Sequence, residues 1–92
     1  MTVTVKFPTP LQKFTNNQKE ITSSGSNITE LLDSLESSCP GLKKRLYNGD
    51  GDKLNRFLLF YVNDEDIRFL DGTNTPLKDG DEVSIISAVA GG

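Results

Sequence analysis

The chain has 92 residues and a formal charge of −3 at pH 7. A chain of this length builds a single core, and its acidic balance argues against a nucleic-acid-binding surface. One cysteine and no histidine cannot supply the ligands of a thiolate zinc site or an iron–sulfur cluster, or the usual nucleophile–base pairs of catalysis. We therefore expect one domain over residues 1–92 that binds no metal and is not itself an enzyme.

The sequence also bears on the compartment. It contains no apolar run close to the roughly 20 residues that a membrane-spanning helix needs. Its opening residues, MTVTVKFPTP, lack the long apolar segment of a secretory signal peptide. We expect a cytoplasmic protein.

The first elements are two strands. In residues 2–7 apolar and polar side chains alternate, which predicts a strand with one face turned inward. Pro8 and Pro10 end this strand, because proline cannot donate a backbone hydrogen bond to a neighbouring strand. Residues 18–22 predict a second, shorter strand, with Ile21 inward, so that the two form a hairpin with a long loop.

A helix follows at about residue 28. Asn27 is a suitable N-cap, and Glu30, three residues later, completes a capping-box pattern. The following apolar residues recur at helical spacing on one face: Ile28, Leu31, Leu32 and Leu35. This amphipathic helix must cover a sheet.

Pro40 predicts where this helix ends. Proline lacks a backbone donor and clashes with the preceding turn, so the helix should stop at Ser38 or Cys39. Leu42 and Leu46 resume the same apolar face in a short second helical turn. Cys39 fits a small buried side chain in the core.

The second half of the chain is richer in strands. Residues 57–62, FLLFYV, are apolar on both faces, which predicts a central strand or one whose second face serves a partner. A turn over residues 63–66 leads to a short predicted strand at 67–69. From Glu82 onward Val83 and Ile85 alternate with polar residues, which predicts a final strand.

Two acidic pairs do not predict a catalytic or metal site. Asp79 and Asp81 flank Gly80, which is the signature of a tight turn. Asp50 and Asp52 do not fit a calcium-binding loop, because the position of its bidentate glutamate falls on Leu59 or Tyr61.

Together these elements run strand, strand, helix, strand, strand, strand. They predict an α+β fold in which a mixed sheet of four to five strands packs on one main helix.

The last residues, 87–92, predict a flexible tail after the final strand. The tail ends in Gly91-Gly92, and two terminal glycines cannot form a turn because no residue follows them. Glycine allows close approach to another surface, so a narrow enzyme channel could reach the carboxylate of Gly92. The alternative is an ordinary frayed terminus.

Three groups of residues, taken in their order along the chain, resemble a known family. They are Tyr61-Val62-Asn63, the segment from Leu77 to Val83, and Val89 with terminal Gly91-Gly92. Along nearly its whole length the chain resembles the ubiquitin-like, β-grasp sulfur carriers of the MoaD/ThiS family. Within that family it is most similar to the CysO-type carriers of a cysteine-biosynthesis route.

The resemblance implies a function centred on Gly92. An ATP-dependent enzyme similar to the ubiquitin-activating enzymes would adenylate its carboxylate, and sulfide would then replace AMP to give a thiocarboxylate. The carrier itself would bind no cofactor and would act as a co-substrate. The implied sulfur acceptor is a pyridoxal-phosphate cysteine synthase or, in a MoaD-like protein, the large subunit of molybdopterin synthase.

The residues that would meet these partners fall into two groups. Ala88, Val89, Ala90 and Gly91 would thread into the partner with Gly92 at their end. Ile86 points away from Val83 and Ile85 on the final strand, and we expect it to form a partner surface with Leu59 and Tyr61. We expect the free carrier to be a monomer.

Two other functions use the same features. A protein modifier would join Gly92 to target lysines through an isopeptide bond. A passive interaction domain would use the FLLFYV face alone, and the loss of Gly91-Gly92 would then change nothing.

Overall fold

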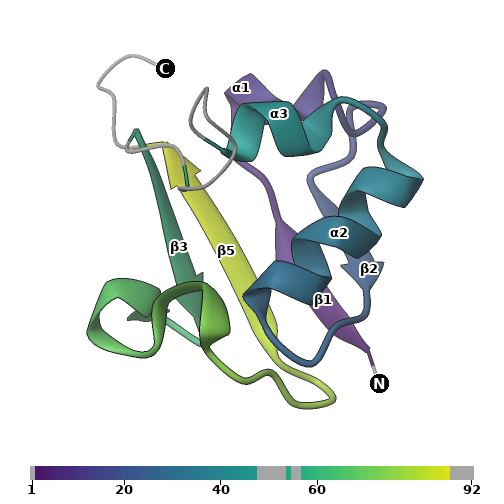
Figure 1. Ribbon diagram of the computed structural model, residues 1–92. Helices are drawn as coiled ribbons and strands as arrows, with labels where there is room; N and C mark the ends of the chain where they lie inside the picture. Colours follow the sequence, from purple (N-terminus) through teal and green to yellow (C-terminus); the bar gives the residue numbers. More distant parts are fainter. Residues whose placement is uncertain (1, 48–53, 55–56, 88–92) are drawn as a thin grey trace.

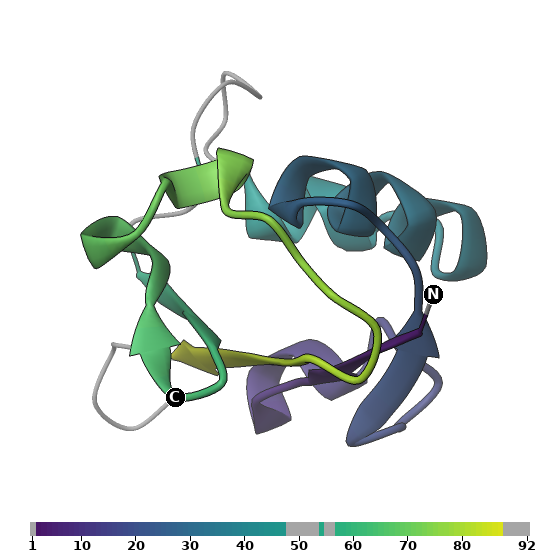
Figure 2. The ribbon, with the colours of Figure 1, turned by 90° about the horizontal axis from the view of Figure 1, so that it is seen from below.

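The computed structural model describes residues 2–47, 54 and 57–87. Within them a five-stranded sheet of order β2-β1-β5-β3-β4 packs one face against the helices (Figure 1). Seen from below, α2 and α3 lie on one side of the sheet (Figure 2). The strands are β1 Val3–Lys6, β2 Glu20–Ser23, β3 Leu58–Val62, β4 Glu65–Asp66 and β5 Glu82–Ser87.

The sheet is mixed. The central strands β1 and β5 run parallel, and the β1–β2, β3–β5 and β3–β4 pairs are antiparallel. The main helix is α2, Ile28–Ser38, followed by the short α3, Leu42–Leu46. The expected mixed sheet on one main helix is confirmed.

The start and end of α2 follow the local sequence. The Oδ1 atom of Asn27 accepts a hydrogen bond from the backbone nitrogen of Glu30 at 2.9 Å, as expected for the N-cap. The Glu30 carboxylate reaches back to the backbone nitrogen of Ser26 at 2.9 Å, one residue before the cap. The helix ends at Ser38, ahead of Pro40, as predicted.

The core lies between this helix and the sheet. Cys39 belongs to it, as predicted, and its burial raises the pKa of the thiol. The core consists of Val3, Val5, Phe7, Leu11, Ile28, Leu31, Leu32, Leu35, Cys39, Leu42, Leu46, Phe60, Val62, Ile67, Leu77, Val83 and Ile85. None of the helices in the described part of the chain is long and apolar enough to cross a membrane.

The connection between β1 and β2 contains a short helix that the sequence analysis did not predict. It is α1, Thr9–Gln12, and Pro10 lies in its first turn. Proline is tolerated there because the first backbone donors of a helix have no partner within it. Pro8 and Pro10 therefore end the strand and also begin a helix, which buries Leu11.

The predicted strand at 67–69 is wrong. Asn63 and Asp64 form a two-residue turn with left-handed backbone angles, φ 50° and φ 72°, so the return strand β4 begins at Glu65. Ile67–Phe69 then forms the 3-10 helix η1, and Gly72–Asn74 forms a second one, η2. The Asp66 carboxylate caps η1 by accepting a hydrogen bond from the backbone nitrogen of Arg68.

Candidate partner-binding face and tail attachment

The strand register brings the three predicted partner-surface residues together. Leu59 lies opposite Ile86, and Tyr61 lies opposite Ser84, on the antiparallel β3–β5 pair. Residues directly opposite each other point to the same face of a sheet. Leu59, Tyr61 and Ile86 therefore form one outer patch, on the face that the helices leave uncovered. Ile86 is 45% exposed, and the other two are half-buried.

The apolar character of β3 on both faces is now explained. Phe60 and Val62 point to the helices and are buried, together with Val83 and Ile85 of β5. Leu59 lies on the other face, where it is half-buried. One face of the strand builds the core, and the other supplies the outer patch.

The rest of the outer face is polar. Thr4 lies opposite Glu82, and Lys6 lies opposite Ser84, on the parallel β1–β5 pair. The Nζ atom of Lys6 forms an ion pair with Glu82 at 3.1 Å, and the hydrogen bond to Glu82 raises the lysine pKa. The apolar side chains are thus confined to the part of the face built by β3 and β5.

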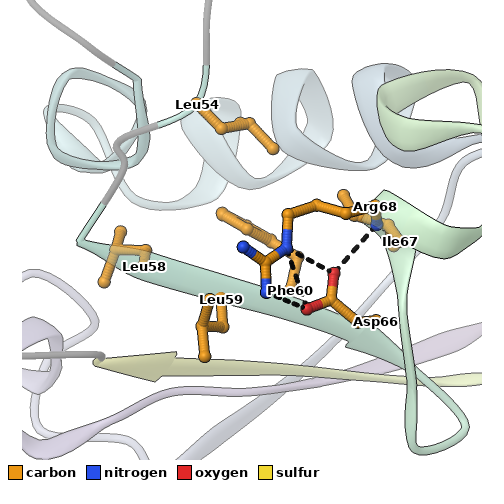
Figure 3. A pocket seen from close by; sticks show the side chains of 7 residues that line it. All are labelled: Leu54, Leu58, Leu59, Phe60, Asp66, Ile67 and Arg68. Carbon is orange, nitrogen blue, oxygen red and sulfur yellow. Dashed lines mark hydrogen bonds and ion pairs between the residues drawn. The ribbon is translucent and has the colours of Figure 1, made fainter.

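A hollow of about 280 Å³ adjoins the outer patch at the edge of β3 (Figure 3). It arises because β4 pairs only with Tyr61 and Val62, so in the described part of the chain no strand covers the edge at 58–60. The residues around it are Leu54, Leu58, Leu59, Phe60, Asp66, Ile67 and Arg68.

An ion pair closes one side of this hollow, and the sequence analysis missed it. The Nε atom of Arg68 donates to Asp66 Oδ2 at 3.0 Å, and its Nη2 atom donates to the same oxygen at 2.7 Å. The Asp66 side chain is only 6% exposed, whereas that of Arg68 is 67% exposed. Hydrogen bonds from the Arg68 side chain and backbone lower the pKa of Asp66. The two residues are separated by one position and lie at the start of η1, where Asp66 is the N-cap.

Phe69 is a second residue that the sequence analysis did not single out. Its side chain is 85% exposed, and it lines a shallow hollow with Tyr61 and Arg68. We predicted that Phe69 lies in a strand and did not expect it to be exposed. The three residues IRF are too few for alternation to distinguish a strand from a turn of 3-10 helix.

The attachment point of the tail is the end of β5. Ser87, which the sequence analysis assigned to the tail, is the last strand residue and pairs with Leu58. The predicted tail residues Ala88, Val89, Ala90, Gly91 and Gly92 lie outside the described residues, so their roles stay predictions. The strand register places the outer patch next to this point, because Ile86 immediately precedes Ser87.

The acidic pair at 79 and 81 has a structural role. Asp79 Oδ1 accepts a hydrogen bond from the backbone nitrogen of Thr2 at 2.6 Å. Asp81 accepts from the Asn63 amide at 3.0 Å and from the backbone nitrogen of Lys78 at 2.8 Å, and these bonds lower its pKa. Gly80 between them has a left-handed φ of 89°, as a tight turn requires.

In the part of the chain that the structure describes, no three His, Cys, Asp or Glu side chains are grouped so that they could hold a metal ion.

Comparison with known proteins identifies related carriers. The chain is 44% identical over 93 residues to the sulfur carrier protein CysO of Mycobacterium tuberculosis (strain ATCC 25618 / H37Rv), and the match covers all of both chains. A chain of the Amycolatopsis orientalis BexX/CysO complex superposes with a TM-score of 0.90 at 44% identity, covering 98% of this chain and 99% of that one.

A third relative has a different description. The small archaeal modifier protein 1 of Methanosarcina acetivorans matches with a TM-score of 0.83 at 32% identity, covering 99% of this chain and 96% of that one. These superpositions confirm the ubiquitin-like β-grasp fold expected from the sequence. The model of the ThiS family matches residues 5–92. The chain therefore belongs to the ThiS family.

Proposed function

We propose that this chain is a sulfur carrier protein that carries sulfur as a thiocarboxylate on Gly92. The observation that carries the proposal is the 44% identity, over the whole of both chains, to a protein described as the sulfur carrier CysO. The fold supports it, since β5 holds the point from which residues 88–92 continue. The tail and the outer patch then act together, the tail in the partner's channel and the patch against its surface.

The chemistry takes place on the partner enzyme. A free carboxylate is a poor electrophile, so the Gly92 oxygen first attacks the α-phosphorus of ATP, and pyrophosphate leaves. Sulfide then attacks the acyl carbon of the adenylate, AMP leaves, and a thiocarboxylate remains. The carrier contributes a reachable carboxylate and a docking face, and it acts as a co-substrate that binds no cofactor itself. We place this reaction in the cytoplasm, where ATP is supplied.

Cysteine biosynthesis is the proposed destination of the sulfur. The similarity to CysO favours it over molybdopterin synthesis. The acceptor would be an activated serine-derived intermediate held on a pyridoxal-phosphate enzyme, and that cofactor chemistry belongs to the partner. The thiocarboxylate sulfur forms the new carbon–sulfur bond, which joins Gly92 to the product as a thioester. Hydrolysis of the acyl–sulfur bond then releases the product and returns Gly92 to a carboxylate.

The test uses the full chain and purified candidate adenylating enzymes of the source organism. The chain is incubated with each enzyme, ATP and a sulfide source, and its intact mass is measured. The expected result is the replacement of one oxygen by sulfur, which requires ATP and is lost when Gly91 and Gly92 are deleted. If no candidate enzyme produces that change, the sulfur-carrier proposal fails.

A protein modifier is the second candidate, favoured by the 32% identity to a small archaeal modifier protein. It predicts that an epitope-tagged chain forms ATP-dependent adducts through Gly92 on lysines in a lysate of the source organism. Peptide mass spectrometry after trypsin digestion would find residues 79–92 as a remnant on those lysines, because Lys78 is the last trypsin site before Gly92. Thiocarboxylate formation without any such remnant would exclude this second role.

A further inference from the structure

The most exposed large apolar side chain in the described part of the chain is that of Phe69, in η1. It is 85% exposed, and the next residue, Leu70, is 38% exposed. Pro76 is also exposed, and it lines a hollow together with both of them. Neighbouring exposed apolar side chains indicate a contact site more strongly than a single one does. We define the η1 patch as Phe69, Leu70 and Pro76.

The backbone beneath this patch is fixed to the core. Ile67, two residues before Phe69, is 3% exposed and anchors η1 in the core. The Asp66 carboxylate accepts from the backbone nitrogen of Arg68, and the backbone nitrogen of Leu70 donates to the Ile67 carbonyl at 3.0 Å. Binding at the η1 patch therefore needs little ordering of the backbone, which lowers its entropic cost.

Carboxylates surround the η1 patch. Phe69 lines two hollows, and the acidic residues that line them are Asp64, Glu65, Asp66, Asp71 and Asp81. The basic residues there are Arg68, which forms an ion pair with Asp66, and Lys78. Asp64, Glu65 and Asp71 are exposed and form no ion pair with another described residue. All residues that line these hollows lie within 57–87, which the structure describes without a gap.

The η1 patch is continuous with the outer patch. Phe69 lines one of its hollows with Tyr61 of the outer patch. The patch lies at the end of β3 opposite to the end of β5 (Figure 1). The five residues of β3 span about 17 Å. A standard interface of about 800 Å² per partner is roughly 30 Å across, so one partner can cover both patches and also reach the point where the tail begins.

The carboxylates favour one kind of occupant. A second copy of this chain would bring the same carboxylates against each other, because a two-fold contact joins the same surface of both copies. An anionic membrane surface is repelled for the same reason. A protein surface with arginine or lysine beside an apolar side chain fits, because such a cation stacks on an aromatic ring and pairs with carboxylates.

We propose that the activating enzyme covers the η1 patch with an apolar side chain flanked by arginine or lysine, so that Phe69 anchors the docked carrier. The inference rests on the proposed function, since it assumes an enzyme that receives the tail. Phe69 supplies the apolar contact, and Asp64 and Glu65 bind the basic group. The tail is held at one end of β3 and the η1 patch at the other, which fixes the direction of the docked carrier.

The apolar contact is tested by Phe69→Ser and the charge by Glu65→Lys. Glu20→Lys is the matched control for the second variant, since it changes the net charge equally. Glu20 is also an exposed strand residue that forms no ion pair with another described residue, but β2 lies at the opposite edge of the sheet from β4. The thermal midpoint of each variant is measured first and should stay close to that of the native chain.

Isothermal titration calorimetry measures binding of each full-length variant to the enzyme that produces the thiocarboxylate. We expect Phe69→Ser to raise Kd at least about 10-fold, as for a central aromatic anchor, at low and high salt alike. Glu65→Lys should raise Kd roughly 3-fold to 10-fold at about 50 mM salt, and by little at about 1 M salt, where charges are screened. Glu20→Lys should change Kd by less than about 2-fold at either salt concentration.

A second measurement does not depend on the stability of Phe69→Ser. Photoreactive benzoylphenylalanine in place of Phe69 keeps an aromatic ring at that position, and on illumination it should cross-link the carrier to the activating enzyme. The same group in place of Thr22, an exposed residue of β2, is the control and should give no cross-link.

A Kd of Phe69→Ser equal to that of the native chain, or no cross-link from position 69, would overturn the inference. Equal Kd values for Glu65→Lys and Glu20→Lys at low salt would also overturn it, because the covering surface would then not be basic. Cross-linking of position 69 to a second copy of the chain instead of the enzyme would overturn it as well. Each result leaves the proposed function intact, provided that the native chain gains sulfur. If it never does so with any candidate enzyme, both proposals fail.

Discussion

Asn63 shows how one residue of the family resemblance stabilises the fold. Its left-handed φ of 50° begins the β3–β4 turn, and asparagine adopts that conformation more readily than most residues. Its Oδ1 atom accepts from the backbone nitrogen of Glu82 at 3.0 Å, and its Nδ2 atom donates to Asp81 at 3.0 Å. The side chain therefore joins the end of β3 to the start of β5, the two strands that build the outer patch.

The Asp66–Arg68 pair predicts a pH dependence of stability. Hydrogen bonds from Arg68 lower the pKa of Asp66 in the folded chain. A carboxyl group with a lowered folded pKa contributes stability at every pH above its unfolded pKa, and it loses that contribution as the pH falls through the folded pKa. The contribution should therefore persist at neutral pH and disappear below the ordinary aspartate value of about 3.9.

Replacing Arg68 by Gln tests this expectation. Carbon-13 NMR titration of the Asp66 carboxyl should give a pKa below the ordinary value in the native chain and a higher one in Arg68→Gln. The urea midpoint of the native chain should also fall more than that of the variant between neutral and acid pH. Equal titration curves for the two proteins would show that Arg68 does not set the charge state of Asp66.

At the scale of the element, α2 supplies the leucines that pack against the sheet to form the core. Leu32 and Leu35 have no exposed surface in the structure. Replacing either by alanine should lower the free energy of unfolding by about 2 to 5 kcal/mol, the usual cost of emptying a buried leucine site. Urea titration measures the loss. Ser37→Ala, at an exposed position of the same helix, serves as the control and should change stability by less than about 0.5 kcal/mol.

The strand β5 contributes to both the core and the outer patch, and Ile86 allows the two contributions to be tested separately. Its side chain is 45% exposed on the outer face, so Ile86→Asp should weaken binding to the activating enzyme and leave the thermal midpoint nearly unchanged. Thr22→Asp is the matched control, since Thr22 is exposed on the same face but lies on β2, opposite Thr4.

Isothermal titration calorimetry compares the two variants. Unchanged affinity of Ile86→Asp, or a loss of affinity equal to that of Thr22→Asp, would show that the outer patch is not the docking face. A variant that unfolds would mean that Ile86 contributes to folding rather than to docking.

At the scale of the whole molecule, the proposed function requires the domain to present the Gly92 carboxylate to another protein. Ordering each backbone of the tail in a channel costs roughly 1 to 2 kcal/mol, so the channel must fit closely to offset that loss. A close fit leaves no room for side chains. Gly92→Ala, or one extra residue after Gly92, should therefore leave the fold intact and block adenylation.

The measurement for this prediction is the gain of sulfur by intact mass, with circular dichroism as the check on folding. An extended chain that gains sulfur as well as the native chain, without being trimmed, would show that the channel does not require the carboxylate at Gly92. Extension of the chain at its other end, beyond Met1, is the control and should leave sulfur transfer unchanged.

The sequence by itself determined the features whose causes lie within a few residues. The Asn27 cap, the apolar spacing of α2 and Pro40 fixed the helix from Ile28 to Ser38. Alternation of apolar and polar residues located the main strands, because the side chains of a strand point to opposite faces in turn. The order of the family's residues along the chain was also sufficient to identify the ThiS family.

Only the tertiary structure decided which residues meet. Asp66 and Arg68 form their ion pair where Asp66 caps η1, and the sequence IRF fits a strand equally well. Gly25 is required because an added Cβ atom would lie 2.5 Å from the backbone nitrogen of Leu31, in a helix that begins three residues after it. The Phe14 ring lies against Lys13 and also against Arg45 of α3, which is about thirty residues further along the chain. Local patterns do not encode such contacts, because residues far apart in the sequence meet only when their elements pack together.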